Sequence, residues 1–223
     1  MPLSSDYIAR GQKSSAEGRR FIGSFVKHET WTNAITLDDN GYLTTTAGPN
    51  ATTSTPTLVG ALVTSGVGIS TYARNVVITV THSSSVVAMS GVITGTDVHG
   101  NVITEAWSVT ATGTSKVYTG TKAFKTVTSV TLVAATDASA NSIIIGTGDK
   151  LGLSERCASV MIVAEEQDGA LATAGTVVKG SSVSTADYYG TYDPNSALNG
   201  ALDFDLWYLV DNIDDAGSAA PNA

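Results

Sequence analysis

The feature that most constrains the fold of this chain is an alternation of apolar and polar residues with a period of two. Successive side chains of a β-strand point to opposite faces, so this period is typical of strands that bury one face. Between residues 102 and 110, one such face consists of Ile103, Glu105, Trp107 and Val109. Turns rich in glycine, asparagine and aspartate separate the alternating runs. The pattern predicts a fold built from many short strands.

The runs predicted as strands of the body lie at residues 58–63, 75–81, 86–94, 102–110, 116–119, 127–134, 142–146, 159–164, 175–179 and 206–210. Composition agrees with them, because charged residues make up only 14% of the chain, against about 25% in ordinary globular proteins. Threonine and valine, which suit a pleated surface, take their place. A spacing of three between apolar residues around Lys125-Thr126 predicts a bulge or a turn there. We expect an all-β protein whose body, residues 57–210, is a β-sandwich or barrel-like.

Residues 1–34 differ from the body, and we expect them to form an extended, partly helical N-terminal arm. Ser4-Ser5-Asp6 could cap the N-terminus of a short helix at residues 7–10, and residues 14–17 have the sequence of a capping box. Glycines at positions 11, 18 and 23 exclude a long helix. The apolar residues at 21, 22, 25 and 26 form a short stripe. That stripe needs a surface to pack against, either in its own chain or in a neighbour.

Residues 35–56 predict a hairpin followed by a linker. The strand-like runs 35–38 and 42–46 flank Asp39-Asn40-Gly41, and Asn-Gly between such runs is a strong hairpin signal. The segment 47–56 contains two prolines, which interrupt strand pairing, so it predicts a boundary between arm and body. Residues 211–223 are acidic and then rich in alanine, glycine and serine, which predicts a flexible acidic tail.

The charge of the chain is unevenly distributed. The net charge is −8, which argues against a general nucleic-acid binder, because backbone phosphates would repel the protein. Five of the twelve basic residues nevertheless lie in the first 27 positions, namely Arg10, Lys13, Arg19, Arg20 and Lys27. A basic arm on an acidic body can dock on an acidic partner, and it can equally be a solvated terminus. The sequence leaves both interpretations open.

Cysteine content and hydropathy indicate the environment of the protein. The chain has one cysteine, Cys157, whose apolar flanks predict a buried small side chain and no intrachain disulfide. The first residues lack the apolar stretch of a secretory signal. No apolar run approaches the ~20 residues that span a bilayer. We therefore expect a protein made in the cytoplasm, with no membrane partner.

Residue types that carry out catalysis are sparse in this sequence. Only His28, His82 and His99 could act as the base of a nucleophilic triad, and the last two are predicted to be turn residues. Asp97 and His99 could share a cation, but no further ligand lies nearby in the sequence. The tail carboxylates lack the spacing of a calcium loop. The pair of carboxylates needed for glycoside cleavage could come from Glu105, Glu165, Glu166 and Asp168, whose separation the sequence does not give.

We therefore expect no enzymatic activity, no cofactor, no metal site and no small-molecule substrate. One set of segments carries a pattern known from other proteins: residues 92–97, 100–105 and 120–131, followed by 148–153 and 190–195. These segments resemble a module that recurs in structural proteins of tailed bacteriophages, often encoded among head genes. The resemblance covers roughly residues 74–210 and hardly touches the arm. It implies a virion structural protein, and it implies no catalytic residues.

The resemblance and the composition together favour a capsid decoration (cement) protein, which stabilises the outer head shell. Its expected partners are the major capsid protein and copies of itself, a trimer being one option, so the expected location is the head surface of the virion. Binding is assigned to basic and aromatic residues of the arm, namely Arg10, Arg19, Arg20, Phe21, Phe25 and Trp31. Each buried aromatic anchor would contribute on the order of 1–3 kcal/mol.

Two other functions stay open at this point. A tail tube or head–tail connector component would need a long hairpin that pairs with the next subunit, and residues 92–110 could supply one. A glycan-binding fibre module would need exposed aromatic side chains for sugar stacking. The candidates for that role are Tyr188, Tyr189, Tyr192 and Trp207, although aromatic residues more often pack in a core.

Overall fold

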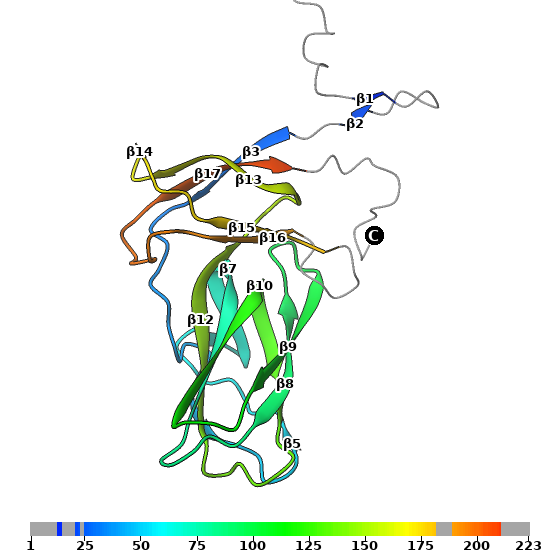
Figure 1. The fold of residues 1–223 in the computed structure, drawn as a ribbon, viewed down its shortest axis with the longest axis vertical. Coiled ribbons are helices and arrows are strands. Elements are labelled where there is room, and N and C mark those ends of the chain that lie inside the picture. Colours follow the sequence, from blue (N-terminus) through cyan, green and yellow to red (C-terminus); the bar gives the residue numbers. More distant parts are fainter. Residues whose placement is uncertain (1–12, 15–20, 23–24, 182–188, 211–223) are drawn as a thin grey trace, which may run out of the picture.

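The computed structural model describes residues 13–14, 21–22, 25–181 and 189–210, with side chains for 26–157, 161–181 and 189–210. The described residues contain seventeen strands and no helix, so the predicted all-β class is confirmed (Figure 1). The strands are β1 (Lys13–Ser14), β2 (Phe21–Ile22), β3 (Phe25–Trp31), β4 (Leu43–Ala47), β5 (Thr53–Ser54), β6 (Val63–Thr64), β7 (Val67–Thr81), β8 (Met89–Thr96), β9 (Val102–Val109), β10 (Ser115–Val130), β11 (Leu132–Val133), β12 (Ser142–Gly152), β13 (Cys157–Gln167), β14 (Ala170–Leu171), β15 (Thr176–Lys179), β16 (Gly190–Asp193) and β17 (Phe204–Val210).

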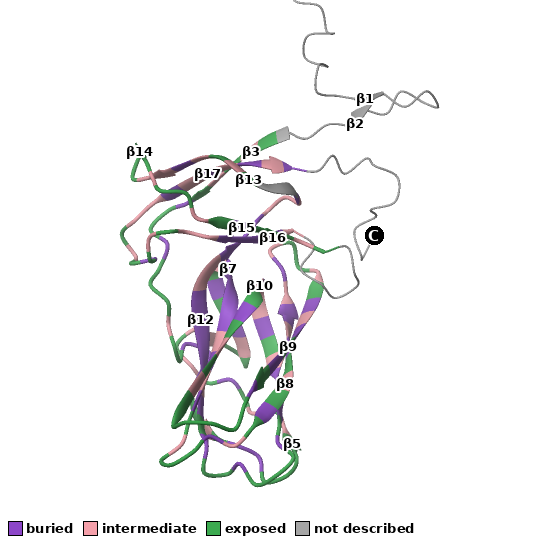
Figure 2. Cartoon of the chain, viewed as in Figure 1, coloured by how far each residue is buried: buried purple, intermediate pink, exposed green. Residues whose placement is uncertain are grey.

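Eleven strands form a large sheet around the first hydrophobic core. Its main path runs β15-β16-β12-β7-β10-β8-β11-β5, with β4, β6 and β9 paired at its sides. The long strands β7, β10 and β12 are central, and Figure 2 shows buried residues running along them. Their inward residues include Val76, Ile78, Phe124, Ile143 and Ile145, all 0% exposed. The alternation in the sequence reflects this burial of one face.

Four strands form a second, small sheet in the order β14-β13-β17-β3. Its inner face packs on the strands β15 and β16 and on the end of β12, as seen in the upper part of Figure 1. The second hydrophobic core between them is built from Trp31, Leu151, Tyr192, Phe204, Leu206 and Tyr208, with other residues. Cys157 belongs to this core at 0% exposure, so its predicted burial is confirmed.

Strand β3 comes from the segment that was predicted to be part of the arm. Each of its residues pairs with β17, from Phe25 opposite Val210 to Trp31 opposite Phe204, without a register shift. Ala34 is 0% exposed as well. Residues 25–31 of the predicted arm are therefore an integral part of the small sheet, and Ala34 belongs to the core beneath it. The helical turn predicted at 7–10 and the tail 211–223 lie outside the described residues, as does most of the capping box at 14–17.

The hairpin predicted at 35–46 is wrong, although the turn inside it exists. The amide of Gly41 donates to the carbonyl of Asp38, but residues 34–38 form no strand. β4 pairs with β12 instead. The carbonyl of Asp38 accepts the amide of Thr147, and the chain passes so close to Gly146 that a Cβ there would collide with it. This close crossing requires a glycine at position 146 inside β12, because any larger residue would collide with the backbone at Asp38.

Two further segments differ from their predictions. Residues 58–62 form a loop because the amides of Val59 and Gly60 both donate to the carbonyl of Tyr42 instead of joining a ladder. The predicted linker at 47–56 is attached to the large sheet, since β5 pairs with β11. By contrast, the predicted bulge is confirmed: the register of β10 on β7 shifts between Phe124 and Thr126.

Candidate interaction surface

An exposed apolar area formed by adjacent strands lies on the side of the small sheet that faces away from the core. We call it the outer face and define it by Val26, His28, Met161, Val163, Trp207 and Leu209. Val26, Met161 and Val163 are 53%, 54% and 51% exposed. Strand pairing brings the residues together, because His28 lies opposite Trp207 and Val26 lies opposite Leu209. Contiguous apolar surface with a polar border is typical of protein–protein contact sites.

A hydrogen-bonded border surrounds the aromatic part of the outer face. The rings of His28 and Trp207 stack in parallel, with centroids 4.2 Å apart and planes 2° from parallel. Nε2 of His28 lies 2.7 Å from the carboxylate of Asp205, and the hydroxyl of Thr30 donates to the same oxygen over 2.6 Å. The Thr30 hydrogen bond, followed by His28, holds the pKa of Asp205 below its usual value. These contacts fix the orientation of the stacked rings.

The structure describes only part of the predicted partner-binding set. The basic members, Arg10, Arg19 and Arg20, lie outside the described residues. Phe21 and Phe25 lie in β2 and β3 by their backbones, and their side chains are outside the description. Their predicted role in binding therefore stays a prediction.

Trp31, the remaining member of that set, is not a surface residue. Its side chain is 2% exposed and stacks on Tyr192, with ring centroids 5.4 Å apart. Its strand pairs it with Phe204, which is 1% exposed. In this chain Trp31 therefore packs in the second core and offers no side chain to a partner, and the prediction of a surface anchor at this position is wrong.

The aromatic residues considered for sugar stacking do not form one strip. Tyr188 lies outside the described residues. Tyr192 is 0% exposed, and burial raises the pKa of its hydroxyl far above the ordinary value. Tyr189 is half-buried against the ring of His99. Trp207 is the member of this group that contributes to the outer face. The geometry therefore does not favour a sugar platform made of these four residues.

The acidic residues of segments 92–97 and 100–105 bind the backbone of their own chain. Asp97, 2% exposed, accepts the amides of His99 and Asn101, each over 2.9 Å, inside the β8–β9 hairpin. Glu105, 6% exposed, accepts the amide and the hydroxyl of Thr121, each over 2.7 Å. These contacts link the first two segments of the module to the third. Both carboxylates are fully explained by structural hydrogen bonds.

The other residues weighed for chemistry have similar roles. Nδ1 of His82 accepts the amides of Ser84 and Ser85, which confirms a turn residue. Glu165 is 4% exposed and accepts the amide of Gly175 over 2.6 Å. It lies in the small sheet, whereas Glu105 lies in the large one. Within the described part of the chain, no three His, Cys, Asp or Glu side chains are grouped closely enough to hold a metal ion.

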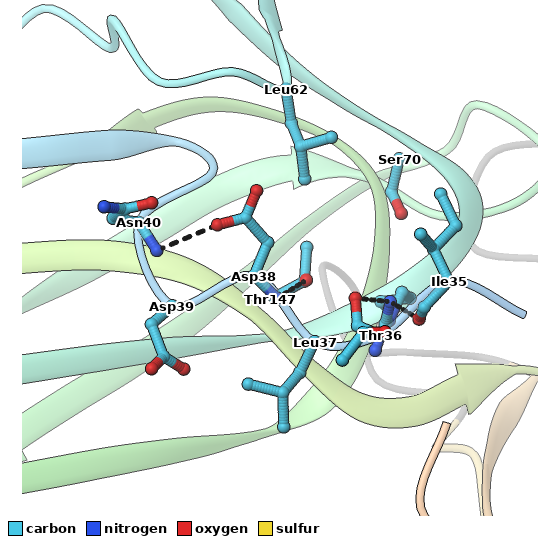
Figure 3. A pocket seen from close by; sticks show the side chains of 10 residues that line it. Ile35, Thr36, Leu37, Asp38, Asp39, Asn40, Leu62, Ser70 and Thr147 are labelled. Atoms are coloured by element: carbon cyan, nitrogen blue, oxygen red, sulfur yellow. Dashed lines mark hydrogen bonds between the residues drawn. The ribbon is translucent and has the colours of Figure 1, made fainter. Parts of the chain in front are cut away.

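One pocket of about 500 Å³ opens beside the turn at residues 38–41 (Figure 3). Arg74 is part of its wall and is only 3% exposed; its Nε donates to the carbonyl of Gly148 over 2.7 Å, and its Nη1 donates to that of Ile35 over 2.6 Å. Burial lowers the pKa of Arg74. Its Nη2 has no hydrogen-bond partner and is closed off from the pocket space by surrounding atoms. Arg74 therefore serves to hold the irregular segment 35–38 on the sheet.

Sequence reasoning missed both the outer face and the role of Arg74. The apolar run that contains Met161 and Val163 predicts a buried strand, and the alternation within it does not tell which face is covered. A single arginine within the apolar run of β7 was a signal for a buried cation that binds carbonyl groups.

Comparison with family models, with curated proteins and with solved structures gave no match. No helix long and apolar enough to cross a membrane occurs among the described residues.

Proposed function

We propose that this chain is a structural subunit of a tailed-bacteriophage particle and that it decorates the capsid by binding the outer head shell. The observation that carries the proposal is the exposed apolar outer face of the small sheet, held on a body whose buried acids serve structural hydrogen bonds. The resemblance of residues 74–210 to virion structural proteins supplies the class. The second core, in which a sandwich-like pair of sheets meets, keeps the outer face rigid.

In this proposal the outer face is the part of the body that contacts the shell. Full burial of an exposed large apolar side chain contributes about 1.5–3 kcal/mol. Met161 and Val163 are 54% and 51% exposed and Trp207 less, so each would contribute part of that figure at the contact with the shell. The basic residues Arg10 and Arg19 precede β3 in the chain and add attraction to an acidic shell. Neighbouring copies then make the same contacts, so that the binding free energy is distributed around the particle.

The direct test is the binding of purified protein to phage heads that lack it. We expect Val163→Glu to weaken head binding at least tenfold, because a carboxylate would be desolvated at the contact. Val117→Glu is the matched control, because Val117 is 58% exposed but belongs to the large sheet. Both variants must keep the wild-type circular dichroism spectrum. Unchanged binding by Val163→Glu contradicts the assignment of the outer face.

The contribution of the N-terminal segment to head binding is tested by deleting residues 1–24. Removing residues 1–34 would take away β3, Trp31 and Ala34, so a loss of binding would report only damage to the second core. Removing residues 1–24 leaves β3 in place. We expect this shorter truncation to fold and to bind heads more weakly than the full chain. Equal binding by the two proteins would contradict a role for the arm.

A tail tube or connector subunit is the second candidate, and one observation favours it. β9 pairs with β8 along its whole length, and in the described chain no strand pairs with its other edge. A tube subunit could pair there with the next copy. Localisation by electron microscopy separates the two functions: density on the head surface supports decoration, and density along the tail or at its junction supports the second candidate.

A further inference from the structure

Strand β3 is an edge strand that carries charged residues but neither a proline nor a bulge. It pairs with β17 on one side, and no strand among the described residues pairs with its other side. Exposed edges of this kind present unpaired backbone groups that pair readily with another strand. The edge therefore has the form of an interface.

We propose that β3 pairs antiparallel with β3 of a second copy, about a two-fold axis at His28. In this register all seven residues are paired, because Phe25 lies opposite Trp31 of the other copy and Val26 lies opposite Thr30. Lys27 then lies opposite Glu29 of the other copy, and by symmetry this pair occurs twice. The carboxylate of Glu29 accepts the amide of Ser154 and the hydroxyl of Tyr208 in its own chain, and Lys27 of the second copy would be a third donor to it. Opposite charges that face each other across strands stabilise the pairing. The edge is thus complementary to itself, as a two-fold interface requires.

The charges also disfavour the neighbouring registers. In an antiparallel pair of identical strands, the cores of both copies lie on the same side of the joined sheet only if one residue lies opposite the same residue of the other copy. Centring the pairing on Lys27 sets two lysines opposite each other, and centring it on Glu29 sets two glutamates opposite each other. Like charges directly opposite are destabilising. The register centred on His28 avoids both and also gives the longest ladder.

The result is one continuous eight-stranded sheet made of two small sheets of four strands. It brings the two outer faces side by side, since Val26 and His28 of each copy lie next to the joint. This proposal rests on the edge of β3 and does not depend on head binding. Purified protein alone tests it, so its failure and the failure of the decoration role are separate outcomes.

Cysteine cross-linking tests the register. Opposite residues of an antiparallel pair have Cα atoms about 4.5–5.5 Å apart, within the range that a disulfide spans. We expect the full-length His28→Cys variant to form a covalent dimer on mild oxidation. Thr30→Cys should stay monomeric on a non-reducing gel, because two copies of residue 30 lie about 14 Å apart along the strands. Cys157 is 0% exposed and will not compete.

A mixture of Val26→Cys and Thr30→Cys provides the positive control, since those positions face each other in the proposed register. Cross-linking of Thr30→Cys with itself as fast as His28→Cys would overturn the register. Absence of any His28→Cys dimer would overturn the interface.

The charge pairing has its own test, in which the mass of the protein in solution is measured by light scattering. We expect wild-type protein to be a dimer and Lys27→Glu to dissociate at least tenfold more readily, since the introduced carboxylate would face Glu29 of the other copy. Lys116→Glu makes the same change of net charge on β10, away from the edge, and should remain a dimer. A Lys27→Glu dimer of wild-type strength would contradict the proposal.

Discussion

The stability of a Trp31→Ala variant shows whether Trp31 is a core residue or a surface anchor. Trp31 is 2% exposed, stacks on Tyr192 and lies at the end of β3 opposite Phe204. A surface anchor could be removed with little effect on stability. A core residue leaves a cavity between the small sheet and the strands below it, and the surrounding side chains fill such a cavity only partly.

The expected loss follows from the size of that side chain. Replacing a fully buried tryptophan with alanine costs about 3–5 kcal/mol, and the stack on Tyr192 places this site toward the upper value. Since whole domains are stable by only about 5–15 kcal/mol, the variant loses a large share of its stability. Trp207→Ala is the control, because Trp207 is partly buried on the outer side of the neighbouring strand and stacks on the exposed ring of His28. We expect that change to cost about 1 kcal/mol.

The assay is urea unfolding followed by far-ultraviolet circular dichroism on both variants at one protein concentration. If Trp31→Ala unfolds at a much lower urea concentration than Trp207→Ala, the position of Trp31 in the second core is supported. If both variants lose the same small amount of unfolding free energy, Trp31 is not held in the core, and there is no ground for excluding it from the binding surface.

Three further changes test individual contacts. Asp97→Ala should cost about 2–4 kcal/mol of unfolding free energy in urea, because the hairpin amides lose their acceptor, and Asp97→Asn should cost about half as much. Arg74→Lys should cost about 2–4 kcal/mol in the same assay, since lysine cannot reach the carbonyls that the guanidinium binds together; equal stability would refute that role. Burial raises the pKa of Glu29 above its ordinary 4.5, so the folded protein takes up this proton first as pH falls. The stability of wild type should therefore rise relative to Glu29→Gln between pH 7 and pH 4, and parallel curves would refute this.

The sequence was sufficient for the fold class and for individual strands wherever one face is buried and the other is solvated. The hairpin of β8 and β9 pairs from Met89–Val109 to Thr96–Val102, close to the predicted segments. The bulge near Thr126 was also predictable, because a break in the apolar period shows directly in the sequence. Local alternation contains this information.

What local alternation does not contain is the partner of each strand. Asn40-Gly41 produces a turn, but residues 35–38 bind β12 through Thr147 and β7 through Arg74. These partners lie 109 and 39 positions away in the sequence, so local alternation gives no sign of them. For the same reason Val26 and Met161 could not be assigned to an exposed surface, because only the complete sheet shows which side is covered.

The placement of charge in this chain follows two patterns. A catalytic acid needs an accessible oxygen that is free to exchange a proton. Asp97, Glu105 and Glu165 are instead each buried, and each binds backbone amides of its own chain, so these three carboxylates have structural roles. In β3, by contrast, the order of Lys27 and Glu29 about His28 places opposite charges across the proposed two-fold axis, on the side of the strand where both side chains are partly buried. Such an edge would join two copies, while the buried carboxylates hold the fold of each copy.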